Sequence, residues 1–78
     1  MQNEFTLLRI AGFDQKSDIK TKIIYWAKTI GKFEIEYVEW CKRLFIYYED
    51  DRCIYTEEFS VNDAINYIKS IEVILTAI

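Results

Sequence analysis

The chain has 78 residues, of which 51% are hydrophobic and 17% are aromatic, and its net charge is −3. This length suits one small domain over residues 1–78, and the hydrophobic content excludes a disordered chain. The net acidity excludes a global basic field that would attract nucleic acid or anionic lipid, and the absence of His removes the commonest metal ligand and general base.

Charge is unevenly distributed along the chain. Residues 14–32 carry five Lys and two Asp, a balance of +3, whereas residues 33–59 carry eight acidic and three basic side chains, a balance of −5. The chain has neither a run of 18 apolar residues nor a charged-then-apolar leader, which predicts a cytoplasmic protein with no membrane partner. Its abundance of Ile, Lys, Tyr and Asn is typical of AT-rich genomes, including those of phages.

We expect residues 1–3 to be loose and the first element to be a strand. The stretch from Glu4 to Ala11 mixes Phe, Thr, Leu and Ile, and its apolar side chains fall on both faces of a strand. Such two-sided hydrophobicity is typical of an inner strand of a sheet. Gly12 and Asp14 end the predicted strand.

The stretch from Ser17 to Ile30 predicts a helix, because its apolar residues fall within an arc of about 100° on a helical wheel. These residues are Ile19, Ile23, Trp26, Ala27 and Ile30. Gly31 then stands where a helix favours a left-handed residue at its C-terminal end. Tyr25 falls on the opposite side of this predicted helix, together with Lys22, Lys28 and Lys32.

The stretch from Phe33 to Phe59 predicts a meander of three antiparallel strands. Its first residues alternate between apolar and acidic, which is the period of a half-buried strand. Two-residue loops at Cys41-Lys42 and Asp50-Asp51 would close both hairpins, and four-residue loops would preserve the same faces. A three-residue loop with a bulge would instead invert one strand.

This register divides the side chains of the meander between two faces. With two-residue loops, Trp40 pairs with Arg43 and Glu49 pairs with Arg52, and Arg43 lies near Glu58. One face collects Phe33, Ile35, Tyr37, Leu44, Ile46, Tyr48, Cys53, Tyr55 and Phe59. The other face collects Val38, Trp40, Phe45, Tyr47 and Ile54, bordered by Glu34, Glu36, Arg43, Glu49, Arg52, Thr56 and Glu58.

The stretch from Ser60 to Ile78 predicts a long helix. Ser60 and Asp63 resemble a capping box, and the apolar residues that follow form one half of a helical wheel. Alternatively, residues 71–78 form a strand, since they are rich in β-branched side chains. The predicted fold is therefore α+β in the order β-α-β-β-β-α, with two helices packed on the sheet. The alternative gives a ferredoxin-like split βαβ arrangement.

Few residues suggest catalysis. Cys41 precedes Lys42 and Arg43, which could activate its thiol, but an ordinary loop residue is the better explanation. Cys53 is predicted to be buried and inert, and the spacing of the two cysteines fits no zinc signature. Glu34 and Glu36 share a strand face and could hold a divalent cation, but they also fit a solvated face. We therefore expect no catalytic residues, no metal and no cofactor.

The aromatic and acidic face of the meander is the candidate site. Its residues are Val38, Trp40, Arg43, Phe45, Tyr47, Ile54 and Glu36. Such a face is core if helices cover both sides of the sheet, a homodimer interface if it binds a second copy, or a docking surface for another protein.

The function that we predict is a non-enzymatic protein-interaction module. An inhibitor or adaptor encoded by a phage or mobile element is one form that such a small acidic module takes. The alternative is an RRM-like module that stacks single-stranded nucleic acid on the aromatic face, although the glutamates around that face would repel phosphates.

Overall fold

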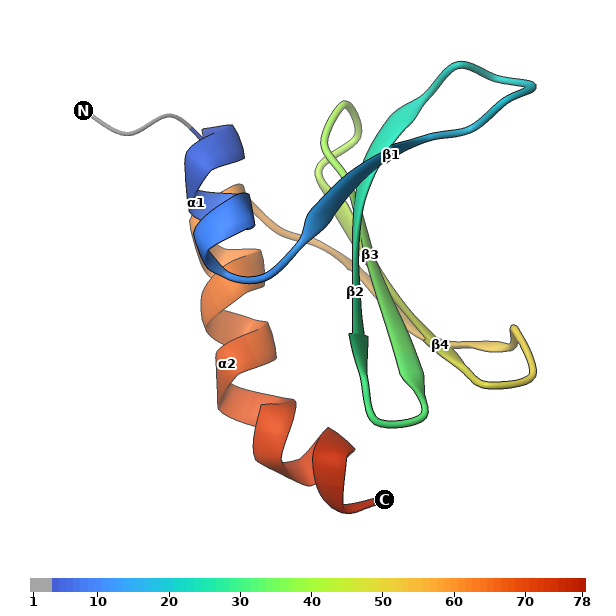
Figure 1. The fold of residues 1–78 in the computed structure, drawn as a ribbon. Helices are drawn as coiled ribbons and strands as arrows, with labels where there is room; N and C mark the ends of the chain where they lie inside the picture. Colours follow the sequence, from blue (N-terminus) through green and yellow to red (C-terminus); the bar gives the residue numbers. More distant parts are fainter. Residues whose placement is uncertain (1–3) are drawn as a thin grey trace.

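Five antiparallel strands in sequential order form the sheet of this chain, and two helices lie on the same face of it (Figure 1). The structure, a computed structural model, describes residues 4–78, so the prediction that residues 1–3 are loose falls outside it. Its elements are α1 (Glu4–Ile10), β1 (Asp14–Ser17), β2 (Ile24–Ile30), β3 (Phe33–Val38), β4 (Arg43–Tyr48), β5 (Cys53–Glu58) and α2 (Val61–Ala77). The predicted small α+β domain with an antiparallel sheet is confirmed, but the element order is α-β-β-β-β-β-α.

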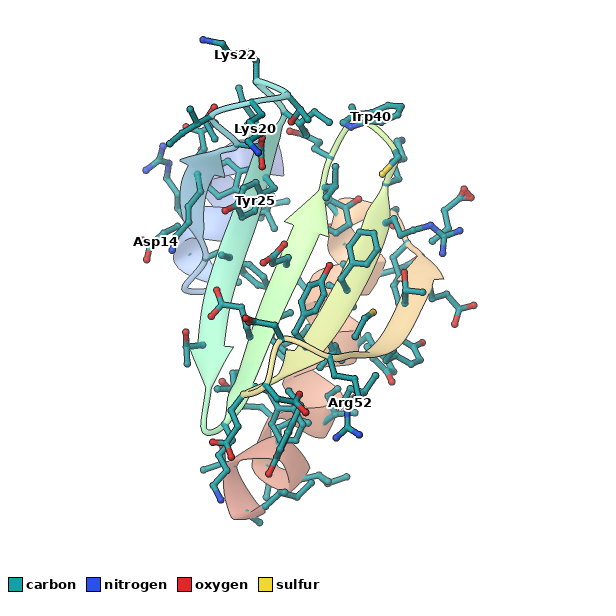
Figure 2. All side chains as sticks on the ribbon, turned by 90° about the vertical axis from the view of Figure 1, so that its right-hand side faces the viewer. Asp14, Lys20, Lys22, Tyr25, Trp40 and Arg52 are labelled. Atoms are coloured by element: carbon teal, nitrogen blue, oxygen red, sulfur yellow. The ribbon has the colours of Figure 1, made fainter. Side chains whose placement is uncertain are left out.

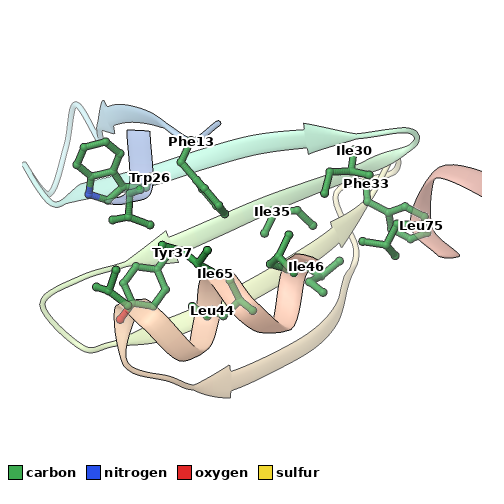
Figure 3. Packing of buried hydrophobic residues seen from close by; sticks show 14 residues of the cluster. Phe13, Trp26, Ile30, Phe33, Ile35, Tyr37, Leu44, Ile46, Ile65 and Leu75 are labelled. Atoms are coloured by element: carbon green, nitrogen blue, oxygen red, sulfur yellow. The ribbon is translucent and has the colours of Figure 1, made fainter. Parts of the chain in front are cut away.

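The core lies between the sheet and the helices, where alternate strand residues point inward (Figure 3). Phe33, Ile35 and Tyr37 of β3 are buried, as the alternation of this strand predicts. Leu44 and Ile46 continue the buried layer on β4. Other elements complete it with Leu8, Phe13, Trp26, Ile30, Val61, Ala64, Ile65, Ile68 and Leu75.

Helix α2 begins and packs as its sequence predicts. The side chain of Ser60 accepts a hydrogen bond from the backbone N–H of Asp63 at 3.2 Å, which satisfies a free donor in the first turn. Residues 71–77 are helical, so no C-terminal strand forms and the ferredoxin-like alternative is not observed. The buried residues of α2 recur at helical spacing and are Val61, Ala64, Ile65, Ile68 and Leu75.

The segment that was predicted as a helix between Ser17 and Ile30 is the hairpin of β1 and β2. Trp26 and Ile30 are four residues apart, a spacing that puts them on one face of either a helix or a strand. The β-branched and aromatic residues of β2 favour the strand. Ile19, which the helical wheel placed in the core, is 90% exposed in the loop between the two strands.

Gly31 serves a hairpin and not a helix end. It is the first of two loop residues between β2 and β3, with a φ of 57°, and a glycine with positive φ at that position is typical of a type II′ turn. A Cβ atom at Gly31 would also lie 3.1 Å from the backbone oxygen of Leu75. Both the turn and the close approach of α2 therefore require glycine here.

The stretch from Glu4 to Ala11, which was predicted as a strand, forms helix α1 and the turn after it. Leu8 and Ala11 are three residues apart and both pack on the core, as they can on one side of a helix. Gly12, with a φ of 95°, ends the helix, and the N–H of Phe13 donates to the Leu8 carbonyl at 3.0 Å. In a segment this short, the apolar residues fit either a helix or a strand. Its contact with α2 therefore determines that the segment is helical.

The β3–β4 hairpin preserves the predicted faces through its four-residue loop, residues 39–42. Val38 pairs with Arg43, so Trp40 lies in the loop and not opposite Arg43. Because four-residue and two-residue loops have the same parity, the side chains of β4 fall on the faces that the sequence predicted.

The β4–β5 hairpin combines a three-residue loop, residues 49–51, with a register shift at Tyr47. Either the odd loop or the register shift alone would move every side chain of β5 to the opposite face of the sheet. Together the two effects cancel along most of the strand. Arg43 therefore lies opposite Glu58, as predicted. Between the loop and the register shift, the side chains of β5 are exchanged between the two faces. Cys53 therefore lies opposite Tyr47 on the outer side of the sheet and is exposed. The prediction that Cys53 is buried is wrong.

Candidate functional site

The face of the sheet opposite the helices, here called the outer face, is not covered by any helix or strand of residues 4–78 (Figures 1 and 2). Directly opposed residues of antiparallel strands share a face, so the register groups its side chains into three rows. The rows are Lys16, Tyr25, Val38, Arg43 and Glu58; Asp14, Ala27, Glu36, Phe45 and Thr56; and Thr29, Glu34, Tyr47 and Cys53. The alternative in which helices cover both faces of the sheet is not observed for the part of the chain described.

An aromatic pair lies at the middle of the outer face. Phe45 and Tyr47 are two residues apart on β4, and their rings stack with centroids 6.1 Å apart and an angle of 17° between planes. Both side chains are half-buried, and so is Val38 on the neighbouring strand. Because the two rings stack on each other, their side chains lose little conformational entropy when another molecule binds.

A partly dehydrated carboxylate lies beside this pair. Glu36 stands between Ala27 and Phe45 in the middle row. Burial raises the pKa of Glu36 above its ordinary value, and repulsion from Glu34 raises it further. Burial also raises the pKa of Tyr47, with a second contribution from the charge of Glu36. A cationic group that contacted Glu36 would therefore be favoured, because it would replace lost hydration.

The residues predicted for the site are only partly brought together. The outer face holds Val38, Arg43, Phe45, Tyr47 and Glu36 in adjacent rows. Trp40 lies in the β3–β4 loop, is 73% exposed and shares a shallow hollow with Lys22 and Ile24. Ile54 lies on the edge strand β5, close to the register shift, and is 49% exposed.

Two arginine side chains near the candidate site make polar contacts that the sequence did not predict. The Arg43 guanidinium donates to the Thr56 hydroxyl at 3.3 Å. Arg52 was predicted to lie near Glu49, but its Nε lies 3.7 Å from a carboxylate oxygen of Asp50. The three-residue loop causes this difference, because it turns the chain one residue earlier than a pairing of Glu49 with Arg52 would require.

Sequence reasoning missed the contribution of β1 and β2 to the outer face. Lys16 and Tyr25 extend the row of Val38, and Asp14 extends the row of Glu36. They were missed because this segment was predicted as a helix. The run of β-branched and aromatic residues from Ile23 to Trp26 was the signal that favoured a strand.

The lysine-bearing side that was predicted around Tyr25 does not form. The Lys28 ammonium points to the opposite face of the sheet, where it donates to the Ala11 carbonyl at 2.8 Å and lies 3.2 Å from a carboxylate oxygen of Glu72. Lys22 and Lys32 lie in different loops at opposite ends of β2. The structure therefore assembles no basic strip on this segment for nucleic acid.

Cys41 lies in the β3–β4 loop, and Cys53 is exposed on β5. The Cys41 sulfur is half-buried and lies 3.7 Å from the Val38 carbonyl oxygen. Among residues 4–78, no three His, Cys, Asp or Glu side chains come together in a way that could hold a metal ion.

No protein family model, no curated protein and no solved structure matches this chain. No helix in the described part of the chain is long and apolar enough to span a bilayer. The function of the chain has to be inferred from the chemistry of its own surfaces.

Proposed function

We propose that this chain is a non-enzymatic protein-interaction module that binds a partner protein through its outer face. The observation that carries the proposal is the stacked pair of Phe45 and Tyr47, which lies half-buried on a sheet face that no described element covers. Aromatic and Arg side chains are enriched where protein interfaces gain most of their affinity. Arg43 lies in the row next to this pair.

The charges of the outer face indicate which partner chemistry would complement it. Glu34 and Glu36 flank the aromatic pair, and Asp14 and Glu58 lie at the two edges of the sheet. These acids outnumber the basic side chains of the three rows. We infer that the partner surface has an apolar centre and carries Lys or Arg around it.

The role that fits such a module is inhibition or bridging of a partner. A chain of 78 residues with one ordered, acidic face can cover a basic surface, as inhibitors and adaptors encoded by mobile elements do. We infer a cytoplasmic location from the two free cysteines, since unpaired thiols are typical of reducing compartments.

The test compares capture of partners by the wild-type chain and by variants. Tyr47→Ala is expected to weaken capture more than about tenfold, which corresponds to the loss of a hot spot. Its melting temperature should change little, because the ring lies outside the core. Lys69→Ala is the matched control, since Lys69 is exposed on α2 and should capture normally.

Equal capture by the wild type and by both Tyr47→Ala and Phe45→Ala would overturn the proposal. A wild-type dimer in light scattering that Tyr47→Ala converts to a monomer would assign the outer face to self-association instead. Binding of labelled single-stranded oligonucleotides that weakens steeply with salt would assign it to nucleic acid. The Glu34 and Glu36 carboxylates oppose that result, because they repel phosphates.

A further inference from the structure

The second half of helix α2 has an apolar side that faces away from the sheet. Figure 1 shows that α1 lies beside the first turns of α2 and that the later turns extend past it. On these later turns Ile74 is 60% exposed and Ile78 is 59% exposed, whereas Leu75 faces the sheet and is buried. This side is here called the open side of α2, and it consists of Tyr67, Ser70, Ile71, Ile74, Ala77 and Ile78.

The large apolar residues of the open side recur at a spacing of four, three and four residues. They are Tyr67, Ile71, Ile74 and Ile78. Residues three and four apart lie on one face of a helix, and this alternation is the seam along which two helices pack. The buried residues of α2 form a different stripe, so the fold of one chain does not require Ile74 or Ile78.

The open side carries no charged side chain. From residue 64 to residue 78 the charged residues are Lys69 and Glu72. At about 100° per residue, these two lie roughly 140° and 160° around the helix from Ile74, the centre of the open side. Glu72 is directed instead to the Lys28 ammonium, 3.2 Å away. An exposed helix side with large apolar residues and no charge indicates a surface that another apolar surface covers.

The apolar surface continues from α2 onto the edge of the sheet. The ring of Tyr67 stacks on those of Tyr55 and Phe59, with centroids 5.3 Å and 5.2 Å away. All three rings are half-buried. The Tyr55 hydroxyl donates to a carboxylate oxygen of Glu57 at 2.8 Å, so it is already paired within the chain. These rings enlarge the surface that a partner of the open side would contact.

The hydroxyl on the open side is also paired within the chain. The Ser70 Oγ donates to the Tyr67 carbonyl oxygen at 2.6 Å. A buried hydroxyl costs free energy when its donor has no acceptor, and this hydrogen bond remains when Ser70 is covered. Removing the open side from water therefore leaves no hydroxyl donor without an acceptor.

The shape of the open side is complementary to itself. Along the helix, the large side chain of Ile74 stands between the small ones of Ser70 and Ala77. Helices pack when large side chains of one enter the spaces beside small side chains of the other. If two copies of α2 run antiparallel about a two-fold axis, Ile74 of each copy lies opposite Ser70 of the other, and Tyr67 lies opposite Ala77. Each large side chain then meets a small one.

We propose that the open side of α2 binds a second copy of this chain in a symmetric dimer with antiparallel α2 helices. Its lack of charge favours this occupant, because a copy supplies an equally uncharged and apolar surface. The outer face cannot pair with itself in this way, since Glu34 and Glu36 would oppose like charges. The preponderance of Ile also matches homodimer interfaces, which are more apolar than those of transient complexes.

The dimer would have two binding faces. Both helices lie on the inner face of the sheet, so a contact through α2 leaves each outer face uncovered. Two linked outer faces would hold a partner with two matching surfaces more tightly than one face does, because the second contact forms at a high effective concentration. The dimer itself does not depend on the proposed function, since it uses none of the residues of the outer face.

The experiment measures molar mass by light scattering from about 10 μM to about 1 mM, which covers micromolar to millimolar dissociation constants. We expect the wild type to approach twice the 9.4 kDa of one chain. Ile74→Glu should weaken self-association by more than about a hundredfold, because the interface would bury unpaired carboxylates. Ile19→Glu is the matched control, since Ile19 is 90% exposed in the β1–β2 loop, and it should dimerise normally.

Mixing two variants tests the antiparallel alignment. Ser70→Glu and Ile74→Lys should each be monomeric alone, and an equimolar mixture should form a heterodimer, because the new carboxylate of one copy lies opposite the new ammonium of the other. Circular dichroism checks that each variant is folded. A wild type that stays monomeric to about 1 mM would overturn the proposal. A dimer that Ile74→Glu leaves intact and Tyr47→Ala dissociates would also overturn it, and would place self-association on the outer face.

Discussion

The two faces of the sheet are built from alternate residues of the same strands, yet they differ in what covers them. Ile35 and Leu44 on the inner face are fully buried beneath the helices. Glu36 and Phe45 follow them directly in the chain and are half-buried on the outer face. The centre of the inner face is apolar except for Lys28, whose ammonium is satisfied by a carbonyl and a carboxylate oxygen. Gln15 and Glu57 lie on the same face at the two edge strands.

The difference shows which side chains folding requires. The inner face supplies the core, so its residues are explained by stability alone. The outer face supplies a stacked aromatic pair and a dehydrated carboxylate that the core does not need. These residues are available for binding, and substitutions that distinguish the two faces test this division directly.

The largest contrast is expected between two neighbours on β4. Leu44→Ala should lower the free energy of unfolding by about 2–5 kcal/mol, because it leaves a cavity in the core. Phe45→Ala should lower it by about 1 kcal/mol or less, since it removes mainly contacts with cross-strand neighbours. Urea denaturation of both variants measures the contrast. Equal losses would show that the outer face is also core.

A smaller contrast is expected between two tyrosine hydroxyls. The Tyr37 hydroxyl is in the core and donates to the Phe59 carbonyl at 2.7 Å. Tyr37→Phe should therefore lower the free energy of unfolding by about 1–2 kcal/mol, since a partly buried carbonyl loses its donor. Tyr47→Phe on the outer face should change it by less than about 0.5 kcal/mol. Thermal denaturation with matched concentrations would detect the difference, and a larger effect at Tyr47 would contradict it.

The smallest effect is a pH dependence at Glu36. Its pKa is raised in the folded chain, so the folded state binds this proton more tightly than the unfolded state does. As pH rises above the ordinary value of 4.5, the unfolded state ionises first and the contribution of Glu36 to stability falls until the folded carboxyl has ionised too. Glu36→Gln should thus be more stable than the wild type at about pH 7 but not at about pH 4.

The effect at Glu36 should be small, because water screens a half-exposed side chain. If the wild type were more stable than Glu36→Gln at neutral pH, the prediction would be contradicted. The Glu36 carboxylate would then have a contact that stabilises its charged form.

The meander and the last helix could be predicted because their patterns are local. The alternation of β3 is unambiguous, and Ser60 with the apolar stripe of α2 indicates a capped helix. As a result, Val38, Arg43, Phe45 and Tyr47 were correctly assigned to one face. Trp40 was assigned to that face only because a shorter loop was assumed.

The structure of residues 4–30 could not be predicted, because the spacing of their apolar residues fits both a helix and a strand. Trp26 and Ile30 share a face in a helix and in a strand, and α1 is only seven residues long. The prediction also failed at Cys53, where a loop of odd length and a register shift compensate each other. Neither feature has a signature as clear as the glycine of the β2–β3 turn.

The three-strand meander, its two alternating faces and the capped C-terminal helix could be recognised from the sequence, because each follows from residue spacing and local hydrogen bonding. The packing of the elements against one another placed both helices on the same face, which leaves Phe45 and Tyr47 uncovered. The physical reason is that burial depends on what packs against a surface, and residue spacing within one element does not specify its neighbour.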